Sequence, residues 1–282
     1  MDKELLKRVE IMFENLNSQS AAGSFPPPGT LADLLSSYVD PLSPSTTVAA
    51  TRGILTCFAT AAVEMWLRAT HSFLISASLT EASPIWSSVA GYYSSHYSIR
   101  AFAHLFGVFQ LHNKKRVVRL DKEGNRLIFR IEKKQGYDRE HKFYWKFVSE
   151  HPQLAADPFF YPNREDQLDG GHRNKANYSD HICKYPVFHP LDSQFFKDRV
   201  ERISSIEFSS VPVPRTDAAH FPDVENTQLI AYHRLVKFRQ LLDEICAENR
   251  FWKVQRKPSW CPDSMTFSVV EPVFAALYAR KP

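Results

Sequence analysis

The chain has 282 residues, of which 44% are hydrophobic, 23% charged and 13% aromatic. This composition supports a folded core and excludes a chain that is disordered over most of its length. The formal net charge of +4 is small, so only the local distribution of charge can indicate a partner. Nine glycines against 18 prolines argue against a glycine-rich nucleotide-binding loop.

The compartment is inferred from the amino terminus and the cysteines. The chain is charged from Asp2 onward, which is not typical of a secretory signal. The most apolar stretch, 53–79, carries Glu64, Arg68 and His71, which disfavours a membrane span. The cysteines are scattered without paired spacing: Cys57, Cys183, Cys246 and Cys261. We therefore expect a soluble, cytoplasmic protein with reduced thiols.

The amino-terminal region is predicted to hold short helices before the main core. Apolar residues at helical spacing over 2–17 favour an amphipathic helix. Serine, glycine and proline residues over 15–28 then indicate a linker. A second short helix is expected over 31–39, ended by Pro41.

A long helical hairpin is expected next. Residues 45–79 and 85–111 are rich in alanine and aromatic residues at helical spacing, with Pro84 at the break between them. Ser45 to Thr47 offer caps for the first helix. Two long helices joined by a short turn predict an antiparallel pair, the start of a bundle.

A β-hairpin follows these helices. The segments 116–120 and 126–132 are rich in β-branched and aromatic residues and flank a loop of turn-forming residues over 121–125. In the second segment, apolar residues at alternate positions share one face, whereas Arg126 and Arg130 share the other. The pattern predicts that one face packs and the other presents arginines.

The rest of the chain is predicted to be mainly helical. Four further segments are expected to form helices: 137–150, 173–185, 193–206 and 227–248. Loops rich in proline separate several of them, and the residues from 251 onward show no clear pattern.

The predicted fold class is mainly α, a helical bundle with an inserted basic β-hairpin. Residues 1–44 are expected to form an amino-terminal extension with a linker, and 45–206 the helical domain, with the hairpin inserted at 115–133. Residues 207–282 are expected to form a helical carboxy-terminal extension.

Positive charge is concentrated around the hairpin. Between Asn113 and Lys146 there are twelve Lys or Arg and five Asp or Glu, so this window carries +7 and the rest of the chain −3. Aromatic residues lie among the charges: Phe129, Tyr137, Phe143, Tyr144 and Trp145. Such a surface is suited to follow a phosphate backbone and stack bases. The alternative is a solvated hairpin whose aromatic residues face the core.

The residues expected to bind nucleic acid are basic side chains of the hairpin: Arg116, Arg119, Arg126, Arg130, Lys133 and Lys134.

Common enzyme and metal signatures are absent. The sequence has no serine-hydrolase elbow, Walker loop, zinc-protease helix or paired-cysteine motif. Four side chains of metal-ligating type lie close in sequence: His172, His181, Cys183 and His189. Their spacing matches no standard site, so we expect neither a metal nor a cofactor.

The helix predicted over 85–111 places Arg100 and His104 one turn apart on the same face. An arginine there is suited to hold a phosphate and a histidine to move a proton, and metal-independent RNA cleavage needs that pairing. The alternative is a helix that buries its aromatic residues and tolerates both polar ones. The sequence leaves both interpretations open.

A second polar cluster spans 172–181 (HRNKANYSDH). In a helix, Arg173, Asn177 and His181 fall at i, i+4 and i+8, close to one stripe. Tyr178 adds a phenol to these groups. The cluster fits a phosphate or nucleotide site, and equally a capped helix start whose Arg173 makes a structural ion pair.

Together these two segments resemble the HEPN superfamily (the higher eukaryotes and prokaryotes nucleotide-binding domain). YYSSHYSIRA at 92–101 is similar to a pattern on one long helix of such proteins. RNKANYSD at 173–180 is similar to the Arg-x-x-Ala-Asp-Tyr-Asp pattern of a later helix. The expected helix 195–206, which begins FFKDRVERI, stands where such proteins place their closing helix. The resemblance covers about residues 45–206.

The resemblance implies an RNA-directed helical bundle of a prokaryotic toxin or antiphage-defence system. It implies a homodimer or a subunit of a larger complex. A metal-independent endoribonuclease and a non-catalytic subunit that binds a nucleotide, a nucleic acid or a protein partner are both compatible with it.

Ribonucleases of this superfamily carry an Arg-x4–6-His motif in a composite site at a dimer interface. By that analogy Arg173 with His181 or His172, or Arg100 with His104, would carry catalysis. Three residues separate Arg100 from His104 and seven separate Arg173 from His181, so both pairs depart from the motif. The ligand-binding residues implied alongside them are Asn177 and Tyr178. Arg215 and His220 have the motif spacing but lie among prolines.

Overall fold

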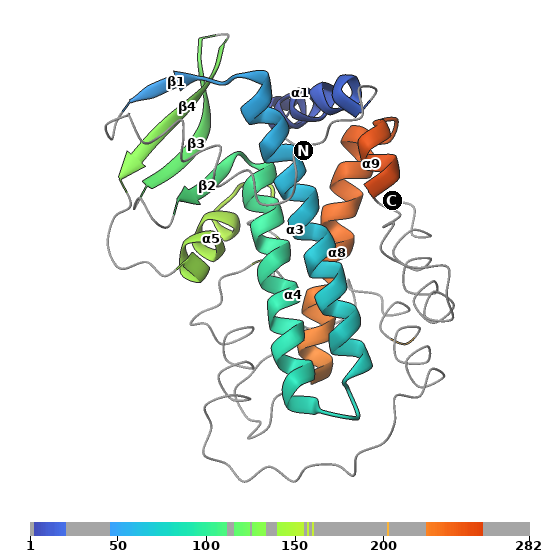
Figure 1. Ribbon diagram of the computed structural model, residues 1–282. Helices are drawn as coiled ribbons and strands as arrows, with labels where there is room; N and C mark the ends of the chain where they lie inside the picture. The colour runs from blue at the N-terminus through green and yellow to red at the C-terminus, as the bar shows by residue number, and fades with distance from the viewer. Residues whose placement is uncertain are drawn as a thin grey trace. The chain divides into compact units, whose positions relative to one another are not determined.

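The computed structural model of the chain describes residues 3–20, 46–111, 116–124, 126–133, 140–154, 157, 160, 202 and 224–255. Within these residues the protein is mainly helical, with six helices and one four-stranded antiparallel sheet (Figure 1). The expected fold class, a mainly α bundle that carries a β-hairpin, is therefore confirmed.

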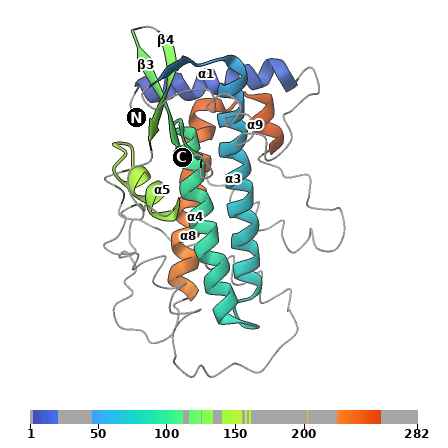
Figure 2. The ribbon, with the colours of Figure 1, turned by 60° about the vertical axis from the view of Figure 1, so that its left-hand side comes forward.

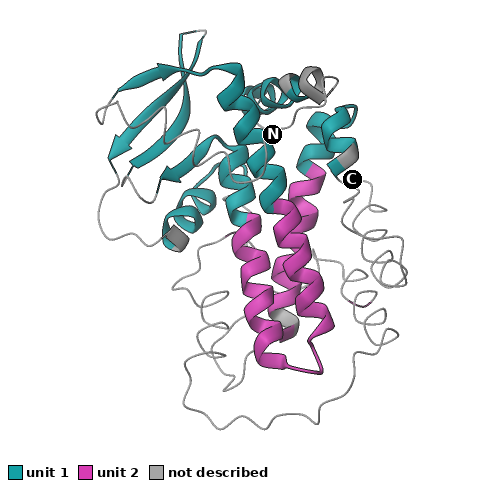
Figure 3. Ribbon diagram, viewed as in Figure 1, with its two compact units in different colours: residues 1–65, 99–153, 241–256 teal, residues 66–98, 154–240, 257–282 magenta. Residues whose placement is uncertain are grey.

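The chain divides into two compact units, each built from separated parts of the sequence (Figure 3). Unit 1 comprises residues 1–65, 99–153 and 241–256, whereas the remaining residues form unit 2. The expected division into three consecutive parts stays a prediction.

Unit 1 contains the sheet. Its strands are β1 (Thr47–Ala49), β2 (Val108–Leu111), β3 (Arg116–Glu123) and β4 (Arg126–Lys133). They pair antiparallel in the order β1-β4-β3-β2, so the predicted hairpin forms the two central strands.

The hairpin has longer strands and a shorter turn than expected. Glu123 pairs with Arg126, so only two positions separate the paired ends. Gly124 has φ +60°, a conformation that favours glycine in two-residue turns. The expected loop over 121–125 is therefore wrong, because the pairing continues through Asp121 to the turn.

The outer strands were not expected from the sequence. Thr47 enters β1 instead of capping a helix, and Thr51 takes the capping role by accepting a hydrogen bond from the Ile54 N–H at 3.4 Å. The helix predicted over 85–111 ends early, because Gly107 has φ +79° and turns the chain into β2. A Cβ at Gly107 would collide with Leu120, so the chain approaches β3 closely there.

Helix α1 (Lys3–Ser20) confirms the predicted amino-terminal helix and packs in unit 1 against α9 (Arg250–Gln255), which the sequence did not indicate. The ring centres of Phe13 and Phe251 are 6.4 Å apart. The Asn249 side-chain N–H donates to the Phe13 carbonyl at 2.7 Å, which ties the two helices together.

Helices α3 (Arg52–Ser78) and α4 (Pro84–Leu105) confirm the predicted antiparallel pair (Figures 1 and 2). Pro84 stands at the first helical position, where its missing N–H costs nothing. In unit 2, the Ser94 hydroxyl of α4 donates to the Ala69 carbonyl of α3 at 2.7 Å. Buried polar contacts therefore fix the register of this pair.

Helix α8 (Val224–Cys246) confirms the last long helix predicted. In unit 2, the indole N–H of Trp66 donates to the Leu235 carbonyl at 3.0 Å. A Cβ added at Gly91 would lie 2.6 Å from the Thr227 methyl group, so α4 and α8 approach closely at this point.

In the described part of the chain, no helix is long and apolar enough to cross a membrane. The helices predicted over 31–39, 173–185 and 193–206 lie outside the described residues, apart from Arg202. The helix predicted over 137–150 is present as α5 (Glu140–Ser149).

Candidate nucleic-acid interface

The strand register sorts the hairpin side chains onto two faces of the sheet. Because side chains alternate along a strand, Arg126 and Arg130 of β4 lie on the face opposite to Phe129. On β3, Arg119 pairs directly with Arg130 and therefore shares its face. We call this face, defined by Arg119, Arg126 and Arg130, the arginine face.

The opposite face packs against α3 in unit 1. The ring of Phe58 from α3 stacks on Phe129, with centres 5.5 Å apart and an interplanar angle of 10°. Phe58 also contacts Phe109 edge-on at 6.4 Å. This packing confirms the predicted apolar side of the hairpin and turns the arginine face away from α3 (Figure 1).

Helix α5 lies next to β2 (Figure 1) and covers the β2 end of the arginine face. The Tyr144 hydroxyl accepts a hydrogen bond from the Gln110 backbone N–H at 3.0 Å. The guanidinium carbon of Arg119 lies 5.2 Å from the ring centre of Phe147, a cation–π contact. Arg119 therefore marks the border between the covered and the open part of the face.

The open part of the face extends from β3 across β4 to β1. Arg126 and Arg130 are exposed, as are Thr47 and Ala49 on the neighbouring edge strand. Ile128 shares this face, as the alternation along the strand predicts, and its side chain is buried.

Two carboxylates on the same face bind two of its arginines. Arg119 Nε donates to Glu132 Oε2 at 2.9 Å, and Arg130 Nε donates to Asp121 Oδ2 at 2.6 Å. The side chains are 35% and 44% exposed in the first pair and 53% and 44% in the second. Ion pairs at this exposure contribute little to stability, so both guanidinium groups can exchange to another anion at small cost.

Asp121 is held in its charged form. The backbone N–H of Lys122 donates to its Oδ1 at 2.8 Å, and this hydrogen bond is the main reason why the pKa of Asp121 is lowered. Burial is the next largest effect and raises the pKa, whereas the Arg130 guanidinium lowers it further.

Lys122 of the hairpin pairs with Glu4 of α1 at 3.3 Å. The other described hairpin cations, Arg116, Arg126 and Lys133, have no ion-pair partner among the described residues. Arg126 is exposed on the arginine face. Arg116 and Lys133 pair with each other in the register and lie on the face of Phe129, at the end of the hairpin remote from the turn. Lys134 lies outside the described residues.

The aromatic residues do not form the stacking surface that the sequence suggested. Phe129 and Tyr144 are buried, which fits the alternative that they face the core. Phe143 and Trp145 of α5 are half-buried, and Tyr137 lies outside the described residues. The described hairpin therefore offers cations without exposed aromatic rings.

Arg100 and His104 lie one turn apart on α4, as predicted, but His104 is only 1% exposed. Its Nδ1 lies 3.0 Å from the Val108 carbonyl. Burial, and then the charge of Arg100, lower its pKa to about 3. The guanidinium carbon of Arg100 lies 5.5 Å from the Tyr144 ring centre. These contacts favour the structural interpretation of the pair, and a catalytic role stays a prediction.

The second predicted cluster lies outside the described residues. This applies to the proposed catalytic and ligand-binding groups and their neighbours: His172, Arg173, Asn177, Tyr178 and His181. It applies also to Cys183, His189 and the pair Arg215 and His220. Among the residues that the structure does describe, no group of three or more His, Cys, Asp or Glu side chains is arranged to hold a metal ion.

Comparisons of the chain with protein-family models, curated proteins and solved structures found no match. The HEPN resemblance therefore stays an expectation carried by the short motifs of the sequence.

Sequence reasoning missed several polar groups that the fold brings together. The carboxylates of Asp121 and Glu132 were counted only as charges, because their partners are set by the strand register. The side-chain amide of Gln110 is 5% exposed and has no hydrogen-bond partner among the described residues. In unit 2, His233 Nε2 lies 2.9 Å from Asp157 Oδ2. No sequence motif connects residues so far apart.

Proposed function

We propose that the protein is an RNA-directed helical protein of HEPN-like type that holds the phosphate backbone on its arginine face. The observation that carries this proposal is the open row of cations on the sheet, where Arg126 and Arg130 are exposed and Arg119 borders them. Cations of this kind neutralise phosphates and release the counterions of the nucleic acid. The toxin or antiphage-defence context belongs to the same proposal, and so does assembly as a homodimer or complex subunit.

Strand geometry gives the surface a reach that suits a chain of phosphates. Arg126 and Arg130 are four residues apart on β4, a separation of about 13 Å along the strand. Arg119 lies on the neighbouring strand beside Arg130. Guanidinium groups bind phosphate oxygens in a bidentate manner, which favours them over the point charge of a lysine ammonium group.

A binding role is favoured over catalysis by the described residues. A general acid or base has to reach its substrate, and the His104 ring is buried with its Nδ1 against a backbone carbonyl. A ribonuclease centre in this chain would therefore rest on Arg173 with His181 or His172. Labelled RNA incubated with the protein in EDTA tests this pair: loss of cleavage in Arg173→Ala alone supports it, and no cleavage by the folded wild type excludes it.

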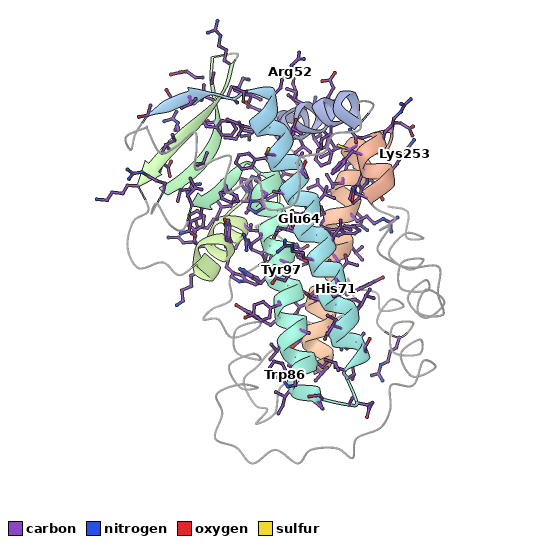
Figure 4. The ribbon with its side chains drawn as sticks, viewed as in Figure 1. Arg52, Glu64, His71, Trp86, Tyr97 and Lys253 are labelled. Atoms are coloured by element: carbon purple, nitrogen blue, oxygen red, sulfur yellow. The ribbon has the colours of Figure 1, made fainter. Side chains whose placement is uncertain are left out.

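Binding is tested by fluorescence anisotropy with a labelled 20-nucleotide RNA. We expect Arg126→Ala to weaken binding by about three- to tenfold, the usual effect of losing one phosphate contact. The matched control is Lys253→Ala, which removes the same charge from α9 in unit 1, far from the hairpin (Figure 4). Lys253 pairs with Glu248 at 2.6 Å, so its charge is already balanced. Equal affinities for both variants would contradict the proposal.

A further inference from the structure

The two ion pairs of the arginine face each join one central strand to the other. Arg119 and Arg130 stand directly opposite in the register, and each bonds a carboxylate of the other strand. Glu132 lies two residues beyond Arg130 on β4, and Asp121 lies two residues beyond Arg119 on β3. Each carboxylate therefore neutralises one of the two neighbouring guanidinium groups, which would otherwise repel each other.

The third arginine of the face has a different environment. Arg126 is exposed and has no carboxylate partner in the described part of the chain. Glu123 is its register partner, yet no ion pair joins the two. The face thus offers one guanidinium that is ready for an anion and two that a carboxylate already holds.

These environments have different consequences for small and large anions. A single phosphate that binds Arg119 or Arg130 has to displace a carboxylate of the neighbouring strand. The sheet holds this carboxylate close to the arginine, so its effective concentration is high. A polyanion that first binds Arg126 presents its next phosphates at a high effective concentration. It can therefore displace both carboxylates in turn, since the exposed pairs are weak.

We propose that Asp121 and Glu132 are internal competitors for phosphate at Arg119 and Arg130, so that a nucleic-acid chain anchored at Arg126 gains these two side chains whereas a single phosphate is disfavoured there. This inference rests on the proposed RNA binding and defines the anion class that the same surface accepts.

The test compares carboxylate-to-amide variants in the RNA anisotropy measurement. We expect Asp121→Asn and Glu132→Gln each to tighten binding by about three- to tenfold, because a repelling charge is removed while the arginines remain. The side-chain oxygen of asparagine can still accept the hydrogen bond of the Lys122 N–H, so the strand end is preserved. Thermal unfolding followed by circular dichroism verifies that the variants fold.

The matched control is Glu248→Gln, which changes the net charge equally. Glu248 is 91% exposed and pairs with Lys253 in unit 1, away from the sheet. The inference is supported if the affinity for RNA is unchanged in this control and higher in both hairpin variants. If the wild type binds RNA and the hairpin variants bind it with equal or lower affinity, the inference is wrong and the proposed function is unaffected.

The remaining outcomes separate the two proposals. If neither the wild type nor the Asp121→Asn, Glu132→Gln double variant binds RNA, both proposals are wrong. If only the double variant binds, the competition is supported and RNA binding by the native surface is wrong. Inorganic phosphate is the second probe: with each protein at the concentration of its own RNA dissociation constant, we expect phosphate to displace RNA from the double variant at a concentration at least about threefold lower than from the wild type. Equal concentrations overturn the proposed selection against single phosphates.

Discussion

The Nδ1 atom of His104 lies 3.0 Å from the carbonyl oxygen of Val108, at the point where α4 ends and β2 begins. A carbonyl oxygen only accepts hydrogen bonds, so Nδ1 carries the proton of the neutral ring. The ring also stacks on Phe109, with centres 5.1 Å apart. A histidine that resembled a proton carrier in the sequence therefore anchors the first turn into the sheet.

This anchor makes stability depend on pH. The pKa of His104 is about 3 in the folded protein, below its ordinary value of 6.5, because burial disfavours the charged ring. As the pH falls below 6.5, the unfolded chain takes up the proton first. The neutral His104 ring therefore contributes fully to the free energy of unfolding above pH 6.5, and this contribution decreases as the pH falls from 6.5 to 3. Between pH 7 and pH 5 the decrease amounts to about 2 kcal/mol.

Urea unfolding at both pH values measures this contribution. His104→Gln retains a donor for the Val108 carbonyl but has no titrating group. We expect the loss of stability between pH 7 and pH 5 to be smaller in the variant by about 2 kcal/mol. The same loss in both proteins would show that His104 is accessible to protons in the folded state.

Because α4 and α8 approach closely at Gly91, we expect replacement of this glycine by alanine to change the stability in the direction opposite to that expected from helix propensity. Glycine to alanine inside a helix normally stabilises by about 1 kcal/mol. At Gly91 we expect a destabilisation of about 1–3 kcal/mol, since the new Cβ would lie 2.6 Å from the Thr227 methyl group. Urea unfolding of Gly91→Ala measures the effect.

Two variants isolate the cause. Gly53 of α3 has no atom within 4 Å of an added Cβ, so Gly53→Ala should not destabilise the protein. Thr227→Ser removes the clashing methyl group and should reduce the cost of Gly91→Ala. An unchanged cost in that background would mean that another contact is responsible.

Gln228 of α8 joins a buried polar cluster in unit 2. Its side-chain N–H group lies 3.2 Å from Ser76 Oγ, 2.9 Å from Thr80 Oγ1 and 3.2 Å from Ser87 Oγ. Gln228→Glu replaces this donor by a buried carboxylate that can only accept. We expect a loss of at least about 2 kcal/mol at pH 7, and part of it should return as the pH falls and the carboxyl group takes up a proton.

Gln228→Met serves as the comparison, because it removes the donor without adding a charge. Its cost should be smaller, about 1–3 kcal/mol, and independent of pH. A glutamate variant as stable as the methionine variant at pH 7 would show that water reaches this cluster.

The long elements of the fold could be predicted from the sequence because local patterns determine them. Apolar spacing and Pro84 indicated the pair α3 and α4, and β-branched residues indicated the hairpin. The edge strands could not be predicted in this way. Val108–Leu111 continues an apolar helical pattern, and only its pairing with the distant β3 makes it a strand.

The candidate site was predictable in composition but not in detail. Alternation placed Arg126 and Arg130 on one face, and this is confirmed. The same charges are partly balanced by Asp121 and Glu132, which requires the register to be known. Burial of His104 depends likewise on residues of other elements, as its contact with Tyr144 at 5.8 Å illustrates.

The salt dependence of RNA binding tests the central claim most directly, because it counts phosphate contacts. For a single strand, each neutralised phosphate contributes a slope of about −0.7 to the plot of log affinity against log salt. We predict that Arg126→Ala reduces the magnitude of the slope by about 0.7, and that the double variant with Arg130→Ala reduces it by about 1.4. Lys253→Ala should retain the wild-type slope. Identical slopes in all four proteins would contradict the account, because the arginine face would then hold no phosphates.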